Sequence, residues 1–157
     1  MNAFLKATLV TVGLLFIAPS IFASESSVPP VGLWKTIDDV SGKPKALVQL
    51  WQGSDNKLYG KILKVFPRPG VELNPVCKEC KDNRHNQPIN GMVFLENLKQ
   101  SNKNAIEWTG GKILDPKNGK SYNCSLQIAD GGEKLNVRGY LGLPLFGRTQ
   151  TWVKESA

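Results

Sequence analysis

Residues 138–152 read RGYLGLPLFGRTQTW, and this stretch near the end of the 157-residue chain decides the fold. Its pattern predicts a strand, a tight apolar corner and a last strand that carries Arg148 and Trp152. Far upstream, the motif GLW at residues 32–34 begins the first predicted strand. A Gly-x-Trp on the first strand and an Arg on the last predict a sheet that closes on itself as a small antiparallel barrel.

Between these two ends, short segments rich in strand-forming residues alternate with turn signals. The turn motifs NG at 118–119 and DGG at 130–132 supply the positive φ angles that tight hairpins need. A short helix is the competing structure for one segment, residues 92–98. The fold class predicted is all-β, a single antiparallel barrel of about eight strands with a filled interior or room for one small ligand. The expected strands are residues 32–37, 45–52, 58–65, 92–98, 105–110, 120–129, 134–140 and 148–154.

The first 23 residues predict a secretory signal peptide rather than part of the fold. A basic residue at Lys6 precedes an apolar run at 7–18 that is too short to span a bilayer. Cleavage is expected after Ala23, because a cut after Ala18 would leave a proline directly behind it. The expected organisation is therefore a signal peptide at 1–23, a flexible leader at 24–30 and a barrel domain at 31–155. The mature protein is expected to be periplasmic or secreted, with no transmembrane span.

The formal net charge of +7 bears on the choice of partners. A basic exported protein tends to associate with anionic components of the cell envelope. The lysines are scattered over turns and strands, however, so an ordinary solvated surface is the preferred interpretation. Nucleic acid is not expected as a partner, because no aromatic and basic motif for it is present.

Further strings extend over nearly the whole chain after the leader. They are GLWKTIDD at 32–39, LYGKI at 58–62, CKEC at 77–80, PING at 88–91, ILDP at 113–116 running on to NGKSY at 118–122, RGYLG at 138–142 and GRTQTW at 147–152. Together they resemble a bacterial secreted family known only as domain of unknown function 2147. The resemblance implies a secreted or periplasmic β-barrel. It implies no activity, because the family's function is itself unassigned.

Gly32 and Trp34, together with the late Arg148, are similar to the calycin, or lipocalin-like, signature. The resemblance implies that Trp34 packs at the closed end of the barrel and that Arg148 lies across its ring. The physical basis would be a cation–π contact and capping of free carbonyls by the guanidinium. Gly32, Trp34 and Arg148 are therefore the expected closure residues, and Arg138 is the rival for the stacking role.

The long connection at 66–89 holds the two close cysteines and the chain's only histidine. In an oxidising compartment Cys77 and Cys80 are expected to form a local disulfide that shapes this loop. A redox site is one alternative, but no helix that would stabilise a thiolate is expected here. A zinc site made with His85 and perhaps Cys124 is the other. The disulfide is preferred, and no metal or cofactor is expected.

The remaining candidates for chemistry have structural explanations that are preferred. Asp38 and Asp39 could form an acid–base pair, but carboxylates in a turn usually bind their own backbone. No nucleophile elbow, phosphate loop or metalloprotease motif is present, so no enzymatic activity is expected. His85 and Asp115 are likewise expected to be loop and turn residues.

Aromatic residues suggest where a ligand could bind. The candidates for lining a ligand cavity are Trp51, Tyr59, Trp108 and Tyr140, with Phe146 beside them, although the same residues could fill the core. The first function expected is therefore the binding of a small apolar or amphipathic molecule in the barrel. The alternatives are an envelope interaction module that uses its basic surface and stapled loop, and a redox or zinc site at the two cysteines.

We expect the exported protein to begin at Ser24. Intact mass and N-terminal sequencing of protein purified after export to a periplasm check this prediction. A mature chain that still carries residues 1–23 would contradict the cleavable signal peptide.

Overall fold

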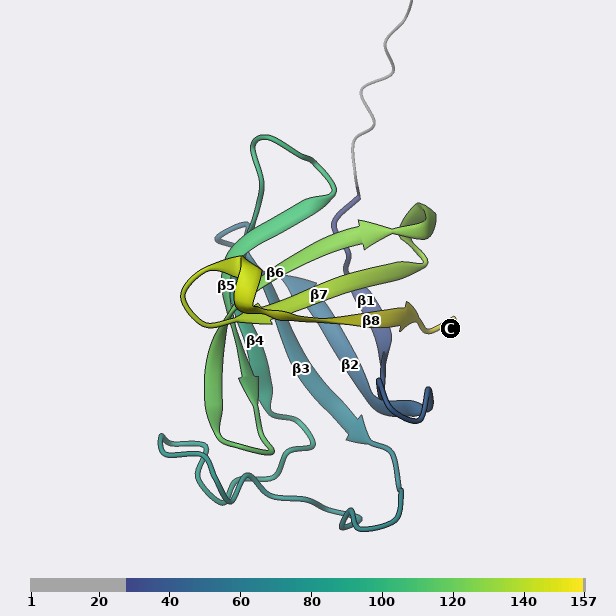
Figure 1. The fold of residues 1–157 in the computed structure, drawn as a ribbon, viewed down its shortest axis with the longest axis vertical. Coiled ribbons are helices and arrows are strands. Elements are labelled where there is room, and N and C mark those ends of the chain that lie inside the picture. The colour runs from purple at the N-terminus through teal and green to yellow at the C-terminus, as the bar shows by residue number, and fades with distance from the viewer. Residues whose placement is uncertain (1–27, 157) are drawn as a thin grey trace, which may run out of the picture.

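The computed structural model describes residues 28–156, and in this range eight antiparallel strands close into one barrel (Figure 1). The expected signal peptide and most of the expected leader lie outside the described residues. The strands are β1 (Gly32–Ile37), β2 (Pro44–Gln52), β3 (Leu58–Val65), β4 (Val93–Gln100), β5 (Glu107–Asp115), β6 (Lys120–Ala129), β7 (Lys134–Tyr140) and β8 (Arg148–Lys154). Two single-turn 3₁₀ helices, η1 (Asp130–Gly132) and η2 (Pro144–Phe146), lie in the last two connections.

Each strand pairs with the next along the chain, and β8 returns to β1. Three residue pairs make this closure, and they place Trp34 opposite Lys154 and Thr36 opposite Trp152. Closure pairs the two edges that an open sheet would expose. The predicted fold class, an antiparallel barrel of eight strands, is confirmed.

Alternation along the strands directs one face of the sheet into a continuous core. In β6 the buried Cys124 and Leu126 alternate with more exposed polar neighbours, as the sequence pattern predicts. The largest fully buried side chains are three tryptophans, Trp34, Trp108 and Trp152, each no more than 1% exposed. The indole N–H of Trp34 donates to the carbonyl of Pro30 at 3.2 Å, so the packing of the domain begins one residue earlier than expected.

The structure resolves the ambiguity of residues 92–98 in favour of a strand, β4. Leu95 and Leu98 are both fully buried although they are three positions apart, a spacing that also favours a helix. The cause is a bulge, because Leu58 and Gly60 of β3 lie opposite Leu98 and Leu95, and Asn97 has a φ of 63°. The extra residue returns the next apolar side chain to the interior.

Strand β5 differs from the prediction, because it continues to Asp115 instead of ending at residue 110. Both Gly110 and Gly111 lie within the strand. A β-carbon at Gly111 would come within 2.7 Å of the Glu96 carbonyl oxygen, so only glycine permits this approach to β4.

We expect Trp34→Ala to lower the free energy of unfolding by about 3–5 kcal/mol, as large core truncations do. Trp51→Ala is the matched control, because the half-buried Trp51 lies on the outer face of β2. Urea denaturation of both variants provides the measurement. Equal losses for the two tryptophans would contradict the placement of Trp34 in the core.

Candidate functional site

A cavity of about 380 Å³ opens at the end of the barrel where β1 ends and β8 begins. Its walls combine an apolar interior with polar side chains nearer the rim. The apolar side chains belong to Ala46, Val48, Ile62, Phe94, Ile113, Leu114, Val137 and Trp152. The polar ones belong to Thr36, Lys45, Asp115, Asn118, Tyr122, Arg148 and Gln150.

The opposite end of the barrel is filled by side chains. Its residues come from the start of β1, β3, β5 and β7 and from the end of β2 and β4, and each is no more than 1% exposed: Trp34, Leu50, Leu58, Leu98, Trp108 and Leu135. One end of the barrel is thus packed as a core, and the other end provides the cavity.

Trp152 lies at the boundary between the packed end and the cavity. Its ring contacts that of Phe94 with centroids 5.9 Å apart, and both rings line the cavity. The indole nitrogen Nε1 of Trp152 is buried and has no hydrogen-bond acceptor among the described residues. A buried donor without an acceptor costs stability, so this N–H is a local weakness in the packing around the cavity.

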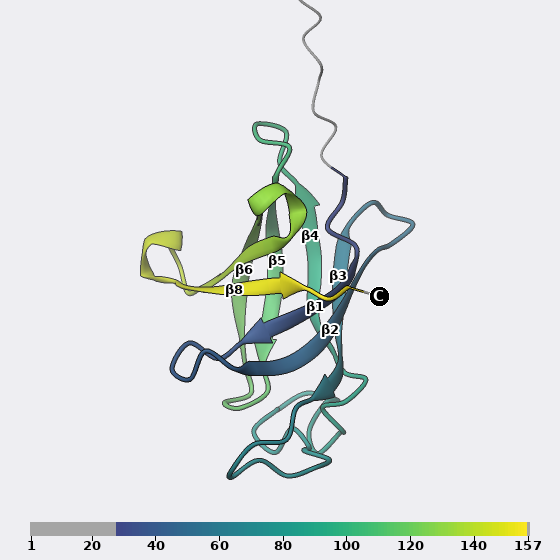
Figure 2. The same cartoon turned by 90° about the vertical axis from the view of Figure 1, so that its right-hand side faces the viewer.

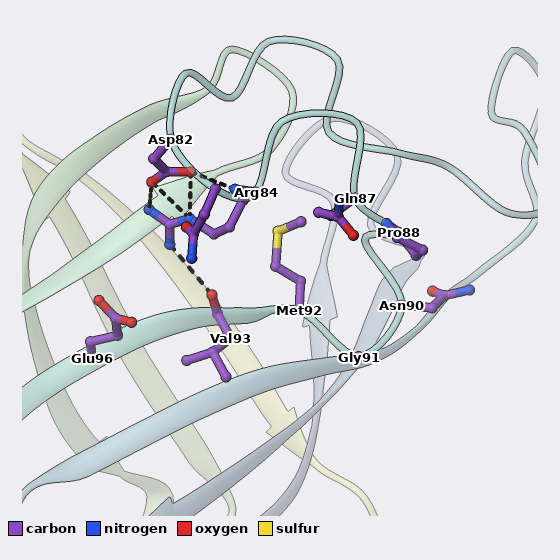
Figure 3. Close-up of a pocket in the computed structure, with 10 residues that line it drawn as sticks. Asp82, Arg84, Gln87, Pro88, Asn90, Gly91, Met92, Val93 and Glu96 are labelled. Atoms are coloured by element: carbon purple, nitrogen blue, oxygen red, sulfur yellow. Dashed lines mark hydrogen bonds and ion pairs between the residues drawn. The ribbon is translucent and has the colours of Figure 1, made fainter.

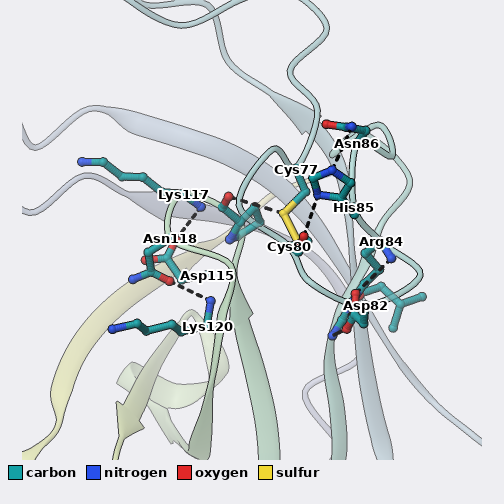
Figure 4. Close-up of a disulfide and its surroundings, with 12 residues drawn as sticks. Cys77, Cys80, Asp82, Arg84, His85, Asn86, Asp115, Lys117, Asn118 and Lys120 are labelled. Atoms are coloured by element: carbon teal, nitrogen blue, oxygen red, sulfur yellow. Dashed lines mark hydrogen bonds and ion pairs between the residues drawn. A yellow bond between two sulfur atoms is a disulfide. The ribbon is translucent and has the colours of Figure 1, made fainter.

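The predicted Cys77–Cys80 disulfide is present, and it lies beside the rim of the cavity (Figure 4). The sulfur of Cys77 is 3.5 Å from the carbonyl oxygen of Pro116, which lines the cavity in the β5–β6 turn. In the same turn, a β-carbon on Gly119 would lie 1.9 Å from the carbonyl oxygen of Glu79. The stapled loop therefore packs directly on the turn that forms one side of the rim.

Side chains within the stapled loop hold its shape. The Nδ1 atom of His85 is 2.7 Å from the carbonyl oxygen of Cys80, and Nε2 is 3.0 Å from the amide nitrogen of Asn86. Both bonds are satisfied when Nδ1–H donates to the carbonyl and Nε2 accepts from the amide. The exposed His85 is thus a structural loop residue, as expected.

A second hollow, about 600 Å³, lies between this loop and the outer face of β4 (Figure 3). Its one arginine, Arg84, donates to the carboxylate of Asp82 and lies 3.5 Å from the Val93 carbonyl oxygen. These hydrogen bonds lower the pKa of Asp82 to about 2, so the pair persists at all but strongly acidic pH. Asp82 and Arg84 are thus engaged with each other, and Arg84 connects the loop to β4 through the Val93 carbonyl.

Comparison with known proteins shows the family to which the chain belongs. Residues 32–154 match the model of a family described as an uncharacterized protein conserved in bacteria, DUF2147. The chain belongs to this family. The structure is also similar to that of protein HP1028 from the human pathogen Helicobacter pylori, which is described as belonging to the lipocalin family. The TM-score is 0.68 at 23% identity, over 83% of this chain and 85% of that one. No curated protein matches the chain.

The lipocalin-like fold expected for this DUF2147 protein is thus shown, but the predicted contact between Arg148 and Trp34 is wrong. Trp34 packs at the closed end, whereas Arg148 lies at the cavity rim and forms an ion pair with Asp39. The residue opposite Trp34 is Lys154. Lys154 is six positions after Arg148 in β8, so the two residues lie about 20 Å apart along the strand. The rival, Arg138, donates instead to carbonyls of the β7–β8 loop.

None of the four residues predicted to line a ligand cavity lines the 380 Å³ cavity. Trp108 belongs to the closed end, and Trp51 stacks on Tyr59 at 5.8 Å on the outer face of β2 and β3. Tyr140 is half-buried at the end of β7, and the neighbouring Phe146 is exposed. The aliphatic and small residues that line the cavity carry no distinctive sequence signal, except that Val48 and Val137 lie on the buried face of alternating strands.

The other sequence candidates have structural roles. The disulfide engages the two sulfur atoms that the zinc alternative would use as thiolates. It is also the oxidised state that the redox alternative would require, so that alternative stays a prediction. Burial raises the pKa of Cys124 to about 12, so its thiol stays protonated at neutral pH. Asp38 accepts hydrogen bonds from the backbone N–H groups of Ser41 and Val40, and these bonds lower its pKa. This carboxylate closes its turn, as preferred from the sequence. Asp115 likewise accepts from the Lys117 N–H.

Among residues 28–156, none of the helices is long and apolar enough to cross a membrane.

We expect Gly119→Ala to destabilise the fold more than Gly42→Ala, by about 1–3 kcal/mol beyond the control. Both glycines have a φ near +68°, so both substitutions carry the same backbone strain. Gly42 has open space around it, whereas Gly119 faces the Glu79 carbonyl, so the difference isolates the packing of the stapled loop on the rim. Thermal unfolding of the two variants gives the comparison, and equal losses would mean that the loop is not seated there.

Proposed function

We propose that this protein binds a small amphipathic molecule in the barrel cavity. The observation that carries the proposal is the cavity itself, which combines apolar inner walls with polar side chains nearer the rim. Its volume of about 380 Å³ lies in the range of small-molecule pockets, about 300–1000 Å³. A lipocalin-like barrel supports the same proposal, since closed barrels of eight strands hold single small ligands.

The lining suggests the chemistry of the ligand. The inner walls favour an apolar body that contacts side chains such as Val48, Phe94 and Val137. A ligand that shifts the Trp152 ring would open its Nε1–H, which is buried without an acceptor among the described residues, to an oxygen or nitrogen atom of the ligand. The rim carries charges of both signs, Lys45 and Arg148 together with Asp115, and Arg148 is already paired with Asp39. The rim would therefore accept a polar headgroup of either charge or of none.

We also propose that the protein acts after export from the cytoplasm. The expected signal peptide at 1–23 supports this location. The disulfide supports it as well, because such bonds persist in oxidising compartments.

The test is titration of the exported protein with decanoate, a single-chain amphiphile, followed by native mass spectrometry. Ala46→Phe places a ring in the cavity, so we expect its affinity for decanoate to fall at least about tenfold. Gln49→Phe is the matched control, because it adds a ring on the outer face of the same strand. Trp152→Phe keeps the ring packing but removes the N–H donor, and it should weaken binding by less than Ala46→Phe.

Melting temperatures with and without decanoate check that each variant folds and that the ligand stabilises the folded state. Unchanged affinity of a folded Ala46→Phe variant would contradict binding in the cavity. Binding lost equally in Gln49→Phe would place the ligand elsewhere.

A further inference from the structure

Four large apolar side chains are exposed together in the β7–β8 loop. Leu141, Leu143, Leu145 and Phe146 have exposed fractions of 59%, 65%, 79% and 74%. We call residues 141–146 the apolar tip. Soluble proteins seldom expose so many large apolar residues next to one another. The apolar tip therefore indicates a contact surface for an apolar partner.

The backbone of the apolar tip is already hydrogen-bonded within the protein. The N–H groups of Phe146 and Gly147 donate to the carbonyls of Leu143 and Pro144 through the 3₁₀ turn η2. Arg138 donates from Nε to the Pro144 carbonyl at 2.7 Å and from Nη2 to the Leu145 carbonyl at 3.2 Å. A loop that enters hydrocarbon must satisfy its polar backbone groups internally, and this loop does so at these positions.

Arg138 also fixes the loop from its base. Its Nη1 donates to the hydroxyl of Thr149 at 2.8 Å, so a single guanidinium joins β8 to the turn η2. The apolar side chains are thus presented by a hydrogen-bonded scaffold. This arrangement reduces the entropy that binding would cost.

Cationic side chains accompany the apolar tip. Arg148 directly follows the loop, and its side chain is 70% exposed. Figure 2 shows the β7–β8 loop and the β1–β2 turn, which carries Lys43, projecting on the same side of the barrel. The acidic groups of that turn are engaged, since Asp39 pairs with Arg148 and Asp38 accepts hydrogen bonds from its own turn. Lys43 is exposed and forms no ion pair among the described residues. An exposed cation on the same side of the barrel as exposed apolar residues fits an anionic lipid surface.

We propose that the apolar tip docks the protein on an anionic lipid bilayer, with Leu145 and Phe146 entering the boundary between headgroups and acyl chains. Lys43 and the exposed side chain of Arg148 then face the lipid phosphates, while Arg138 keeps its hydrogen bonds within the loop. The overall basic charge of the chain favours the same surface. Docking would also bring the cavity rim, which includes Arg148, close to the bilayer. The inference does not rest on ligand binding, because the tip lies outside the cavity lining.

The experiment is co-sedimentation of the exported protein with two kinds of vesicle. One contains phosphatidylethanolamine and phosphatidylglycerol, and the other contains phosphatidylcholine alone. We expect binding to the anionic vesicles that is at least about tenfold tighter than to the neutral ones and that weakens as salt rises. The double substitution Leu145→Ser with Phe146→Ser should reduce binding to the anionic vesicles about tenfold or more.

Val40→Ser is the matched control, because Val40 is an exposed apolar residue of the β1–β2 turn, 93% exposed and outside the tip. It should leave vesicle binding unchanged. The variant Leu145→Cys, labelled with an environment-sensitive fluorophore, should brighten on anionic vesicles, whereas the same label on the variant Val40→Cys should not. The buried Cys124 should not react with the label in the folded protein.

Several outcomes would overturn the proposal. Vesicle binding that the double substitution leaves intact would show that charge alone attracts the protein. Absence of vesicle binding would contradict docking on a bilayer. A self-associated form that the double substitution disperses would assign the tip to a protein contact instead. Decanoate binding by the cavity is measured separately in each variant, so failure of docking and failure of ligand binding are distinguishable.

Discussion

The pairing of β1 with β8 is the contact on which the rest of the structure depends. Three residue pairs join strands that lie more than a hundred residues apart, and they place Thr36 opposite Trp152. Without this pairing two sheet edges would be open, and the interior would be exposed along its side. With it, Trp34 is enclosed, and the space beyond Trp152 becomes a cavity with a single entrance end.

The two ends of the barrel differ in how completely side chains fill them. Tryptophan and leucine side chains fill one end, while smaller side chains such as Ala46 and Val137 leave room at the other. The connections at the open end are then braced from outside. The stapled loop packs on the β5–β6 turn through Cys77 and Glu79, and Arg138 holds the β7–β8 loop. The disulfide thus shapes the rim more than it stabilises the whole fold, because its loop is very short.

Local chemistry explains which parts of the fold could be predicted. Turn residues and alternating strands identified six of the strands to within a residue, because hairpins are determined by neighbours in sequence. The β4 bulge and the close approach at Gly111 were missed, because both are contacts between strands that a one-dimensional pattern does not contain. The Cys77–Cys80 disulfide was predictable because the two cysteines are only three positions apart and the expected compartment is oxidising.

The sequence by itself determined the all-β class, the strand order, the stapled loop and the structural use of Asp38. Each of these follows from residues that are close along the chain or from a pattern repeated through it. Only the tertiary structure decided that Arg148 lies at the rim with Asp39 and that aliphatic residues line the cavity. It also showed that the indole N–H of Trp152, a residue that lines the cavity, is buried without an acceptor among the described residues. The physical reason is that barrel tilt and register decide which residues meet across the interior, and these distances are set by strands far apart in sequence.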